Sequence, residues 1–316
     1  MVKRRNERKL RYSVYRGPGW PEIRPGELLL EYLSDHQLAH WRAQAEELQN
    51  YHYLWFYELE RQRAAQQSEL RLALQAVPGI QVPLDGWGRA IEFKYSGLPL
   101  SCVGSLQWVG GRFNYGIDID SSRYTPFPAL YLGEDMETAL REMHGLLRDS
   151  NRAGLTADEL ALCSRTSVTW LAVTGSANNV FDLTKPENVK PFVDVITSFR
   201  LSNNVRSQES RLRLVPLRLV NTVAILIETL MAENWRQYPT MWSTPANSQL
   251  LGHMLSDAGF EGVLFSSTIT GRRNLAIFPR QLHHSESVIQ VVDSPHTRCS
   301  VLNAATHADA ERVNWD

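Results

Sequence analysis

Gly110-Gly111-Arg112-Phe113-Asn114-Tyr115-Gly116 is the stretch around which the rest of this 316-residue chain is organised. Its three glycines predict a turn in which the backbone can approach another group closely. Arg112 stands inside that turn and offers a planar fork of donors suited to a phosphate or a carboxylate. A structural role is the commoner one for a single arginine of this kind, so a functional reading needs support from other segments.

Two elements directly downstream add an aromatic ring and a carboxylate. Residues 129–132 (Ala-Leu-Tyr-Leu) form a short apolar run typical of a buried strand, and residues 136–147 have the pattern of a helix. The acidic residues Glu134 and Asp135 precede that helix, where they suit the positive end of its dipole. This order predicts a turn, a strand and a helix that together carry Arg112, Tyr131 and Glu142.

The predicted helix has two acidic positions with different expected roles. Glu137 and Arg141 are four residues apart, so we expect them to pair on an exposed face. Glu142 is expected to turn inward, where burial of a carboxylate is costly unless a site uses it. From the residues alone, both a functional and a structural Glu142 remain open.

A third segment, residues 262–267 (Gly-Val-Leu-Phe-Ser-Ser), places hydroxyl groups where a buried strand is expected to end. Serines at such positions commonly cap or turn the chain, so a structural role for Ser266 and Ser267 is the default. The chain has no Gly-x-Ser-x-Gly elbow and no His-Glu-x-x-His sequence, and the spacing of its glycines near Arg112 is not that of a dinucleotide loop. Serine hydrolysis and metal catalysis are therefore not expected.

Composition predicts an ordinary globular protein. The chain is 43% hydrophobic and 21% charged, with a net charge of −1, so no overall field draws it to nucleic acid or membrane. Residues 1–16 are strongly basic, which indicates either a solvated terminus or an arm that binds a partner. Three widely spaced cysteines, and no apolar run long enough to span a membrane, lead us to expect a cytoplasmic protein.

The chain changes character near residue 80. Apolar residues at helical spacing predict two helices, 26–49 and 51–76, with a break near Ser34 or Asn50, and the aromatic residues within 51–57 are interpreted as packing groups. Beyond a turn-rich boundary at 77–88, short strands and helices alternate. We predict strands at 90–93, 98–103, 129–132, 168–173, 180–183, 262–265 and 274–278, and helices at 136–147, 189–199 and 248–258, with an apolar run at 220–231. The segment after Pro279 carries little pattern.

Taken together, these segments resemble the RES family, which is named for its Arg, Glu and Ser. The Gly-x-Arg-Phe-Asn opening followed by Gly116 matches the family's first motif, and Tyr131-Leu132 with Ala139-Leu140-Arg141-Glu142 matches its second. The third motif corresponds to Glu261–Ser267 followed by Gly271 and Asn274–Phe278. Ser266 replaces the usual Pro, so Ser267 matches the family serine, and Ser266 remains the alternative by one position. Residues 181–184 (Phe-Asp-Leu-Thr) resemble a further family segment.

The resemblance implies an α+β fold similar to ADP-ribosyltransferase toxins, with a small central sheet preceded by an α-helical domain. On this basis we expect a helical N-terminal region at 1–89, a RES domain at 90–282 with an insertion at about 200–240, and a C-terminal tail at 283–316. The extra helical region and the insertion are departures from the family pattern, so regulation, partners and the rim of the pocket are the least predictable features.

The resemblance also implies a function. Family members are typically toxins of bacterial toxin–antitoxin pairs that destroy NAD and are held inactive by an Xre-like antitoxin. By analogy, Arg112 would bind the pyrophosphate of NAD, Tyr131 would orient the nicotinamide or its ribose, Glu142 would stabilise positive charge on the ribose, and Ser267 would bind the nicotinamide amide or the ribose.

Further expectations follow from the same resemblance. Asn114 and Ser266 are added to the expected NAD-binding residues. NAD is expected as a substrate rather than a prosthetic group, with no metal, no membrane partner, and contact with nucleic acid only through an antitoxin. A homodimer through the N-terminal helices is a further expectation. The acceptor of the ADP-ribose, whether water, phosphate or a macromolecule, is left open, as is an inert RES-like binding module.

Overall fold

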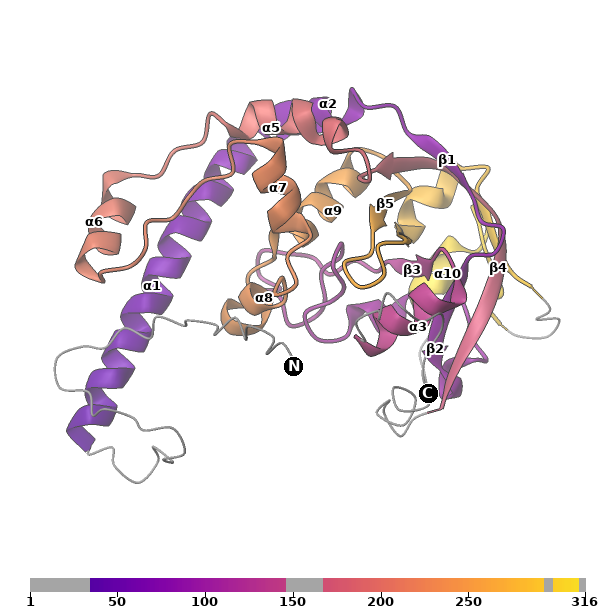
Figure 1. Cartoon of the computed structure of the whole chain (residues 1–316), viewed down its shortest axis with the longest axis horizontal. Coiled ribbons are helices and arrows are strands. Elements are labelled where there is room, and N and C mark those ends of the chain that lie inside the picture. The colour runs from indigo at the N-terminus through magenta and orange to yellow at the C-terminus, as the bar shows by residue number, and fades with distance from the viewer. Residues whose placement is uncertain (1–34, 146–166, 293–297, 313–316) are drawn as a thin grey trace, which may run out of the picture. The chain divides into compact units, whose positions relative to one another are not determined.

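The computed structural model describes residues 35–145, 167–292 and 298–312 (Figure 1). The chain divides into two compact units. One is formed by residues up to Glu60 together with Arg200–Arg218, and the other by Arg61–Phe199 together with the residues from Leu219 onward.

The long helix α1 (Asp35–Ala65) supplies most of the first unit, together with α6 (Asn203–Arg211). The hydroxyl of Tyr51 donates a 2.9 Å hydrogen bond to Glu209 Oε1, which also accepts one of 2.7 Å from the main-chain N–H of Leu217. Tyr51 and Phe56 are buried, which confirms that the aromatic cluster contains packing groups. The basic segment 200–216, which carried no predicted helix, thus forms α6 and is fixed by a buried carboxylate.

The predicted helix break at Asn50 is wrong. Helix α1 continues through Asn50 to Ala65, and a second helix, α2 (Gln67–Gln75), begins after Gln66. The reason is energetic, because asparagine inside a helix costs only about 0.7 kcal/mol relative to alanine, which burial of neighbouring aromatic rings readily offsets. The alternative break near Ser34 falls where the described residues begin.

The second unit is built on an eight-stranded sheet in the order β2-β3-β6-β5-β4-β7-β8, with β1 paired to β4. The strands are β1 (Ile80–Pro83), β2 (Gly88–Glu92), β3 (Leu130–Gly133), β4 (Val168–Asp182), β5 (Gly262–Ser266), β6 (Arg273–Ile277), β7 (Val288–Val291) and β8 (Val301–Leu302). Among the strands of the described residues, β4 and β5 form the only parallel pair. The α+β class is therefore confirmed.

Strand β4 organises this sheet because its two ends have different neighbours. Its first residues pair with β2, and its last residues pair with β5. Since β2 also pairs with β3, the strands β2, β3, β6, β5 and β4 form a closed circuit of hydrogen bonds. Gly175 lies midway along β4 with φ of 111°, a conformation that a residue with a side chain rarely adopts. The two strands predicted at 168–173 and 180–183 are thus one continuous strand.

The remaining helices of this unit are labelled in Figure 1. They are α3 (Met136–His144), α5 (Lys190–Ile196), α7 (Val223–Leu230), α8 (Gln237–Trp242), α9 (Asn247–Asp257) and α10 (His307–Arg312). Short 3-10 turns occupy Phe93–Tyr95, Val103–Leu106, Pro186–Val189 and Pro279–His284. Helices α3, α5 and α9 confirm the predictions, whereas α8 and α10 were not predicted. None of the described helices is long and apolar enough to cross a membrane.

The strand predicted at 98–103 is wrong. Leu100 and Cys102 are buried, but their main-chain N–H groups donate to the carbonyls of Cys299 and Ala310, neither of which forms a ladder with them. The apolar residues at 98–103 therefore indicate that this segment is buried, and they do not indicate a strand. Strand β1 lies within the segment 1–89 that was expected to be helical, and the segment after Pro279 includes β7, β8 and α10.

Candidate active site

A cavity of about 550 Å³ brings together three of the residues singled out in the sequence. Arg112, Tyr131 and Glu142 all line it, although they come from a turn, from β3 and from α3. Its volume is within the roughly 300–1,000 Å³ of typical small-molecule sites. The expected grouping of these side chains is therefore present in the structure.

The turn that carries Arg112 is held close to β3. Gly110 has φ of 91°, and a side chain on Gly111 would collide with the hydroxyl of Tyr131 and with Asn114 Oδ1. The buried amide of Gln249, on α9, lies 2.8 Å from the carbonyl oxygen of Val109 and within hydrogen-bond distance of two further carbonyls of the turn. Gln249 could not be singled out from the sequence, because a glutamine inside a helix has no distinctive spacing.

Asn114 is completely buried and holds the turn and Tyr131 in position through its side-chain amide. Its Oδ1 accepts hydrogen bonds from the N–H of Gly111 (3.0 Å) and the hydroxyl of Tyr131 (2.9 Å). Its Nδ2 donates to the carbonyls of Ser105 (2.8 Å) and Phe127 (3.0 Å). Asn114 is not among the cavity-lining residues, so its contacts make it a group that positions others.

Tyr131 is half-buried, and its hydroxyl is fixed in orientation. It accepts a 2.9 Å hydrogen bond from the N–H of Phe113 while donating to Asn114. Burial raises the pKa of the Tyr131 phenol, which the Phe113 N–H and the charge of Arg112 oppose. The neutral phenol is therefore the relevant form at neutral pH, and its ring forms part of the cavity wall.

Arg112 is anchored through one end of its guanidinium. Nη1 donates to the carbonyls of Leu230 and Ala232, at 3.0 Å each, and the guanidinium lies 5.6 Å from the ring centre of Trp235. Burial lowers the pKa of Arg112, and the nearby Glu142 carboxylate opposes that shift. An arginine remains charged under these conditions, so the site contains a fixed cation.

Glu142 is held at the cavity by a neighbouring strand. Its Oε1 accepts a 2.7 Å hydrogen bond from Nδ2 of Asn274, a buried residue of β6. The prediction that Glu142 turns into the protein interior is wrong, because its side chain is solvent-exposed at the cavity. The neighbouring residue Arg141 is buried instead. It is 1% exposed, and its Nε donates a 2.9 Å hydrogen bond to Glu137 Oε1. The expected Glu137–Arg141 pair thus forms, but Arg141 is not on an exposed face.

Ser267 lies in the loop after β5 and does not line the cavity. It is buried, and its Oγ accepts hydrogen bonds from the N–H groups of Ile269 (3.1 Å) and Thr270 (3.0 Å). Phe265, Thr268 and Ile269 of the same segment do line the cavity. This geometry therefore does not favour direct contact between the Ser267 hydroxyl and a molecule in the cavity. Ser266 is exposed at the end of β5, and it does not line the cavity either.

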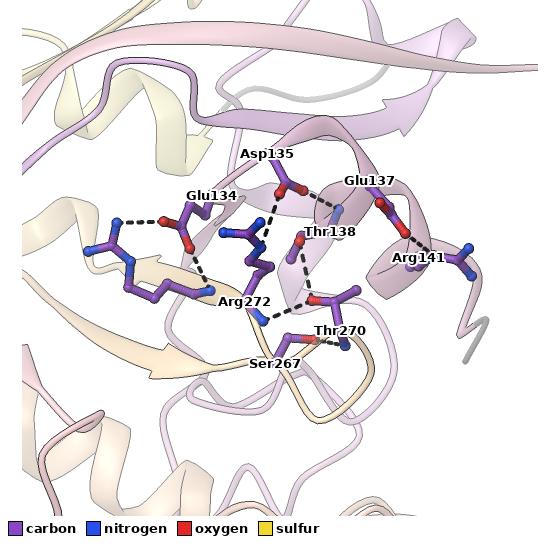
Figure 2. A network of polar contacts seen from close by, with 9 residues as sticks. Glu134, Asp135, Glu137, Thr138, Arg141, Ser267, Thr270 and Arg272 are labelled. Carbon is purple, nitrogen blue, oxygen red and sulfur yellow. Dashed lines mark hydrogen bonds and ion pairs between the residues drawn. The ribbon is translucent and has the colours of Figure 1, made fainter. Parts of the chain in front are cut away.

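The Ser267 loop is joined to the start of α3, as Figure 2 shows. The hydroxyls of Thr138 and Thr270 are 3.2 Å apart, and Asp135 Oδ1 accepts a 2.7 Å hydrogen bond from the N–H of Thr138. Arg272 Nε lies 3.9 Å from the other carboxylate oxygen of Asp135. The helix that carries Glu142 and the loop that carries Ser267 are thereby positioned together.

Two cavity residues were missed in the sequence. Trp235 is buried, and the guanidinium of Arg236 lies 4.4 Å from the centre of its ring. Both residues line the cavity and lie in the segment expected to be an insertion. Because an insertion has no counterpart in a family motif, no resemblance could have identified them.

The cavity is richer in cations than in anions. Three arginines line it, against the carboxylates of Glu142 and Glu233; the arginines are Arg89, Arg112 and Arg236. Among the described residues, no group of three or more His, Cys, Asp or Glu side chains is arranged to hold a metal ion. The arrangement favours an anionic ligand with one carboxylate available to a developing positive charge.

Comparisons with known proteins place the chain in a family. A search of the solved structures finds similarity to the MbcT–MbcA toxin–antitoxin complex of M. tuberculosis, with 17% sequence identity, a TM-score of 0.41, and coverage of 77% of this chain and 96% of that chain. A search of the curated proteins finds no match. The family model of the RES domain matches residues 106–301, which is more than half of the chain. The matched region contains Arg112, Tyr131, Glu142 and Ser267, and this chain belongs to the RES family.

Proposed function

We propose that this protein is a toxin-like enzyme that consumes NAD by cleaving its nicotinamide–ribose bond, as a glycohydrolase or a phosphorylase. The observation that carries the proposal is that Arg112, Tyr131 and Glu142 line one cavity. Membership of the RES family supports the choice of NAD, because the resemblance of these motifs implies that substrate.

The chemistry suits the charges in the cavity. When the bond between nicotinamide nitrogen and ribose C1′ breaks, nicotinamide leaves with the bonding electrons, and positive charge develops on the ribose as in other glycosidic cleavages. The Glu142 carboxylate, oriented by Asn274, would stabilise that charge more strongly in the transition state than in bound NAD. Either a water oxygen then bonds to C1′ and releases a proton to solvent, or an anionic oxygen of phosphate bonds to C1′, and the acceptor stays open between the two.

The other site residues have supporting roles in this proposal. Arg112 would bind the pyrophosphate with the guanidinium nitrogens that do not contact Leu230 and Ala232. Tyr131 would provide a ring against the nicotinamide or its ribose. Asn114 and Ser267 would act through the groups they hold, namely Tyr131 for the former and the loop 268–270 for the latter.

The proposal is tested by measuring free nicotinamide after the purified protein meets NAD. Glu142→Gln keeps the size of the side chain and removes its charge, so we expect release to fall by about 100-fold or more. The matched control is Glu228→Gln on α7, an exposed glutamate that does not line the cavity. Equal nicotinamide release by wild type and Glu142→Gln would contradict the assignment.

The same assay separates the alternatives. With NAD labelled in its ADP-ribose part, transfer of the label to a macromolecule would favour an ADP-ribosyltransferase. Ligand binding without nicotinamide release would favour an inert binding module. The basic segment 200–218 does not favour the transferase, since Arg206 pairs with Glu209 at 2.9 Å and Arg211 with Glu47 at 3.0 Å. Two of the five arginines of this segment are thus already paired within its own unit.

Two protein partners are part of the proposal. An Xre-like antitoxin is expected from family membership, and its test is whether co-expression of an Xre-like protein restores growth of cells that expression of this chain inhibits. A homodimer through α1 is suggested by the exposed Trp41 and Leu48, which are 52% and 39% exposed and seven positions apart on one helix face. Light scattering of Trp41→Glu beside the wild type tests the dimer, which predicts a lower mass for the variant.

A further inference from the structure

A second cavity of about 900 Å³ opens beside the first. The two cavities share lining residues, which are Gly104, Ser105, Gly111, Tyr131, Met143 and Arg236. The second cavity continues between the segment 104–111 and helix α8, where the carbonyl of the lining residue Ser243 accepts a 3.0 Å hydrogen bond from the N–H of Asp120. A ligand too long for the first cavity therefore has a continuous path into the second.

Arg236 lies where the two cavities meet. It lines both of them, and its guanidinium stacks on Trp235. Within the described parts of the chain, this guanidinium forms no hydrogen bond or ion pair, so its donors are open to a ligand. Stacking on an indole holds a guanidinium in place while leaving the edge of its fork free. An anionic group of the ligand is therefore expected at this junction.

Trp108 presents an aromatic ring to the second cavity. It is 75% exposed and has φ of 55°, a left-handed conformation that is uncommon for a bulky residue. The conformation is fixed locally, because the carbonyl of Trp108 accepts a 2.9 Å hydrogen bond from the N–H of Asp118. Strained conformations of this kind concentrate at ligand-binding positions, and an exposed indole is a platform on which a nucleic-acid base stacks.

The charges of the second cavity differ from those of the first. Beyond Arg236, its charged lining residue is Asp118, and the remaining lining groups are neutral, including Gln107 and Thr240. The cationic first cavity thus suits phosphate, whereas the second suits an uncharged aromatic group with hydrogen-bonding edges. A cationic cavity followed by a largely neutral one matches a dinucleotide, in which a pyrophosphate separates two nucleosides.

We propose that the second cavity binds the adenosine half of a dinucleotide, with Arg236 holding the pyrophosphate at the junction and Trp108 stacking on the adenine. The inference rests on the proposed function, because it assumes that the nicotinamide end occupies the first cavity. It adds two residues that determine specificity, and it explains why a site for one glycosidic bond continues into a second cavity.

The test uses the full chain and two measurements. Calorimetric titration with ADP, which contains adenosine and a pyrophosphate but no nicotinamide, reports on the second cavity and its junction with the first. We expect Trp108→Ala and Arg236→Ala each to weaken ADP binding by about tenfold, whereas Trp108→Phe keeps most of it because a ring is retained. The matched controls are Phe93→Ala, which removes a ring that is 62% exposed outside both cavities, and Arg71→Ala on α2.

The second measurement is the ratio of kcat/KM for NAD to that for nicotinamide mononucleotide, which lacks the adenosine half. We expect this preference to fall about tenfold in Trp108→Ala and to persist in the two controls. Unchanged ADP affinity in both cavity variants would overturn the inference even if NAD is cleaved. ADP binding that is lost in the variants, in a protein that releases no nicotinamide, would instead support the inference while overturning the proposed reaction.

Discussion

The hydroxyl of Tyr131 donates a 2.9 Å hydrogen bond to Oδ1 of Asn114, which also accepts one from the N–H of Gly111. The same hydroxyl accepts a hydrogen bond from the N–H of Phe113. The residues on both sides of Arg112 are thus tied to strand β3 through two side chains. The position of the cation relative to the phenol is determined by these contacts.

Asn114→Leu is expected to lower the free energy of unfolding by about 3 kcal/mol. Several buried groups would lose a partner, and each such group costs about 1–3 kcal/mol. Urea denaturation of the purified variant measures this loss. Asn221→Leu, at an exposed position before α7, is the matched control and should change the free energy of unfolding by less than about 0.5 kcal/mol. Equal stabilities of the two variants would show that Asn114 does not hold the turn.

Gly111→Ala is expected to lower NAD cleavage by about tenfold or more. The added methyl group would overlap the Tyr131 hydroxyl and Asn114 Oδ1, and overpacking of this kind costs about 1–3 kcal/mol. The comparison is Gly104→Ala, since Gly104 also lines the first cavity but a methyl group there meets no atom within 4 Å. Nicotinamide release by the two variants, beside the wild type, checks the prediction. It fails if both substitutions are equally tolerated.

Ser267→Ala is expected to reduce kcat/KM for NAD by about tenfold through the loop that it holds. Without its Oγ, the buried turn loses the acceptor for the N–H groups of Ile269 and Thr270. Hydrogen exchange at those two amides should therefore accelerate in the variant. A direct role for the Ser267 hydroxyl would instead reduce activity while leaving the exchange rates unchanged.

Ser266→Ala is the control for the neighbouring position. Ser266 is exposed, and no hydrogen bond of its hydroxyl to the described residues is found, so activity and exchange should both match the wild type. The pair of variants also decides which serine the site uses. A loss of activity in Ser266→Ala alone would reverse the match between Ser267 and the family serine.

Much of the fold was predictable where local patterns and the sheet agree. The strand with Tyr131 and the helix with Glu142 were predicted because an apolar run and an acidic cap identify them, and Asp135 does cap α3 through the N–H of Thr138. The strand prediction for the segment 98–103 was wrong because the burial of this segment depends on contacts with Cys299 and Ala310, about 200 positions away. Such long-range pairing leaves no periodic signal in a single sequence.

Some residues of the candidate site could likewise be identified from the sequence, and others could not. Arg112, Tyr131 and Glu142 were identifiable because their motifs are local, and the cavity contains all three. Gln249 and Arg236 could not be identified, since each acts on the site from a segment without a motif, and Asn274 was recognised as part of a motif but not as the partner of Glu142. The exposure of Glu142 was also unpredictable, because helical spacing alone does not say which face of α3 packs against the sheet.

A last prediction concerns His52 on α1, whose pKa burial lowers from 6.5 to about 4. Its ring is 3% exposed and stacks on Phe56 with 5.9 Å between centres. Above pH 6.5 the histidine is neutral in both the folded and the unfolded chain, so it contributes no pH dependence. Between pH 6.5 and 4 the unfolded chain binds a proton that the folded chain does not, so the free energy of unfolding decreases as the pH falls. Below pH 4 both states are protonated, and the decrease ends.

The expected size of this effect is up to about 3 kcal/mol across the window, at 1.36 kcal/mol for each pKa unit. Because carboxylates titrate in the same range, the measurement is a difference between variants. Urea denaturation followed by circular dichroism from pH 7 to pH 4 should give a flatter pH profile for His52→Gln than for the wild type. His40→Gln, an exposed position on the same helix, should keep the wild-type profile. If His52→Gln and the wild type lose stability in parallel as the pH falls, the buried imidazole is not the source of the acid sensitivity of α1.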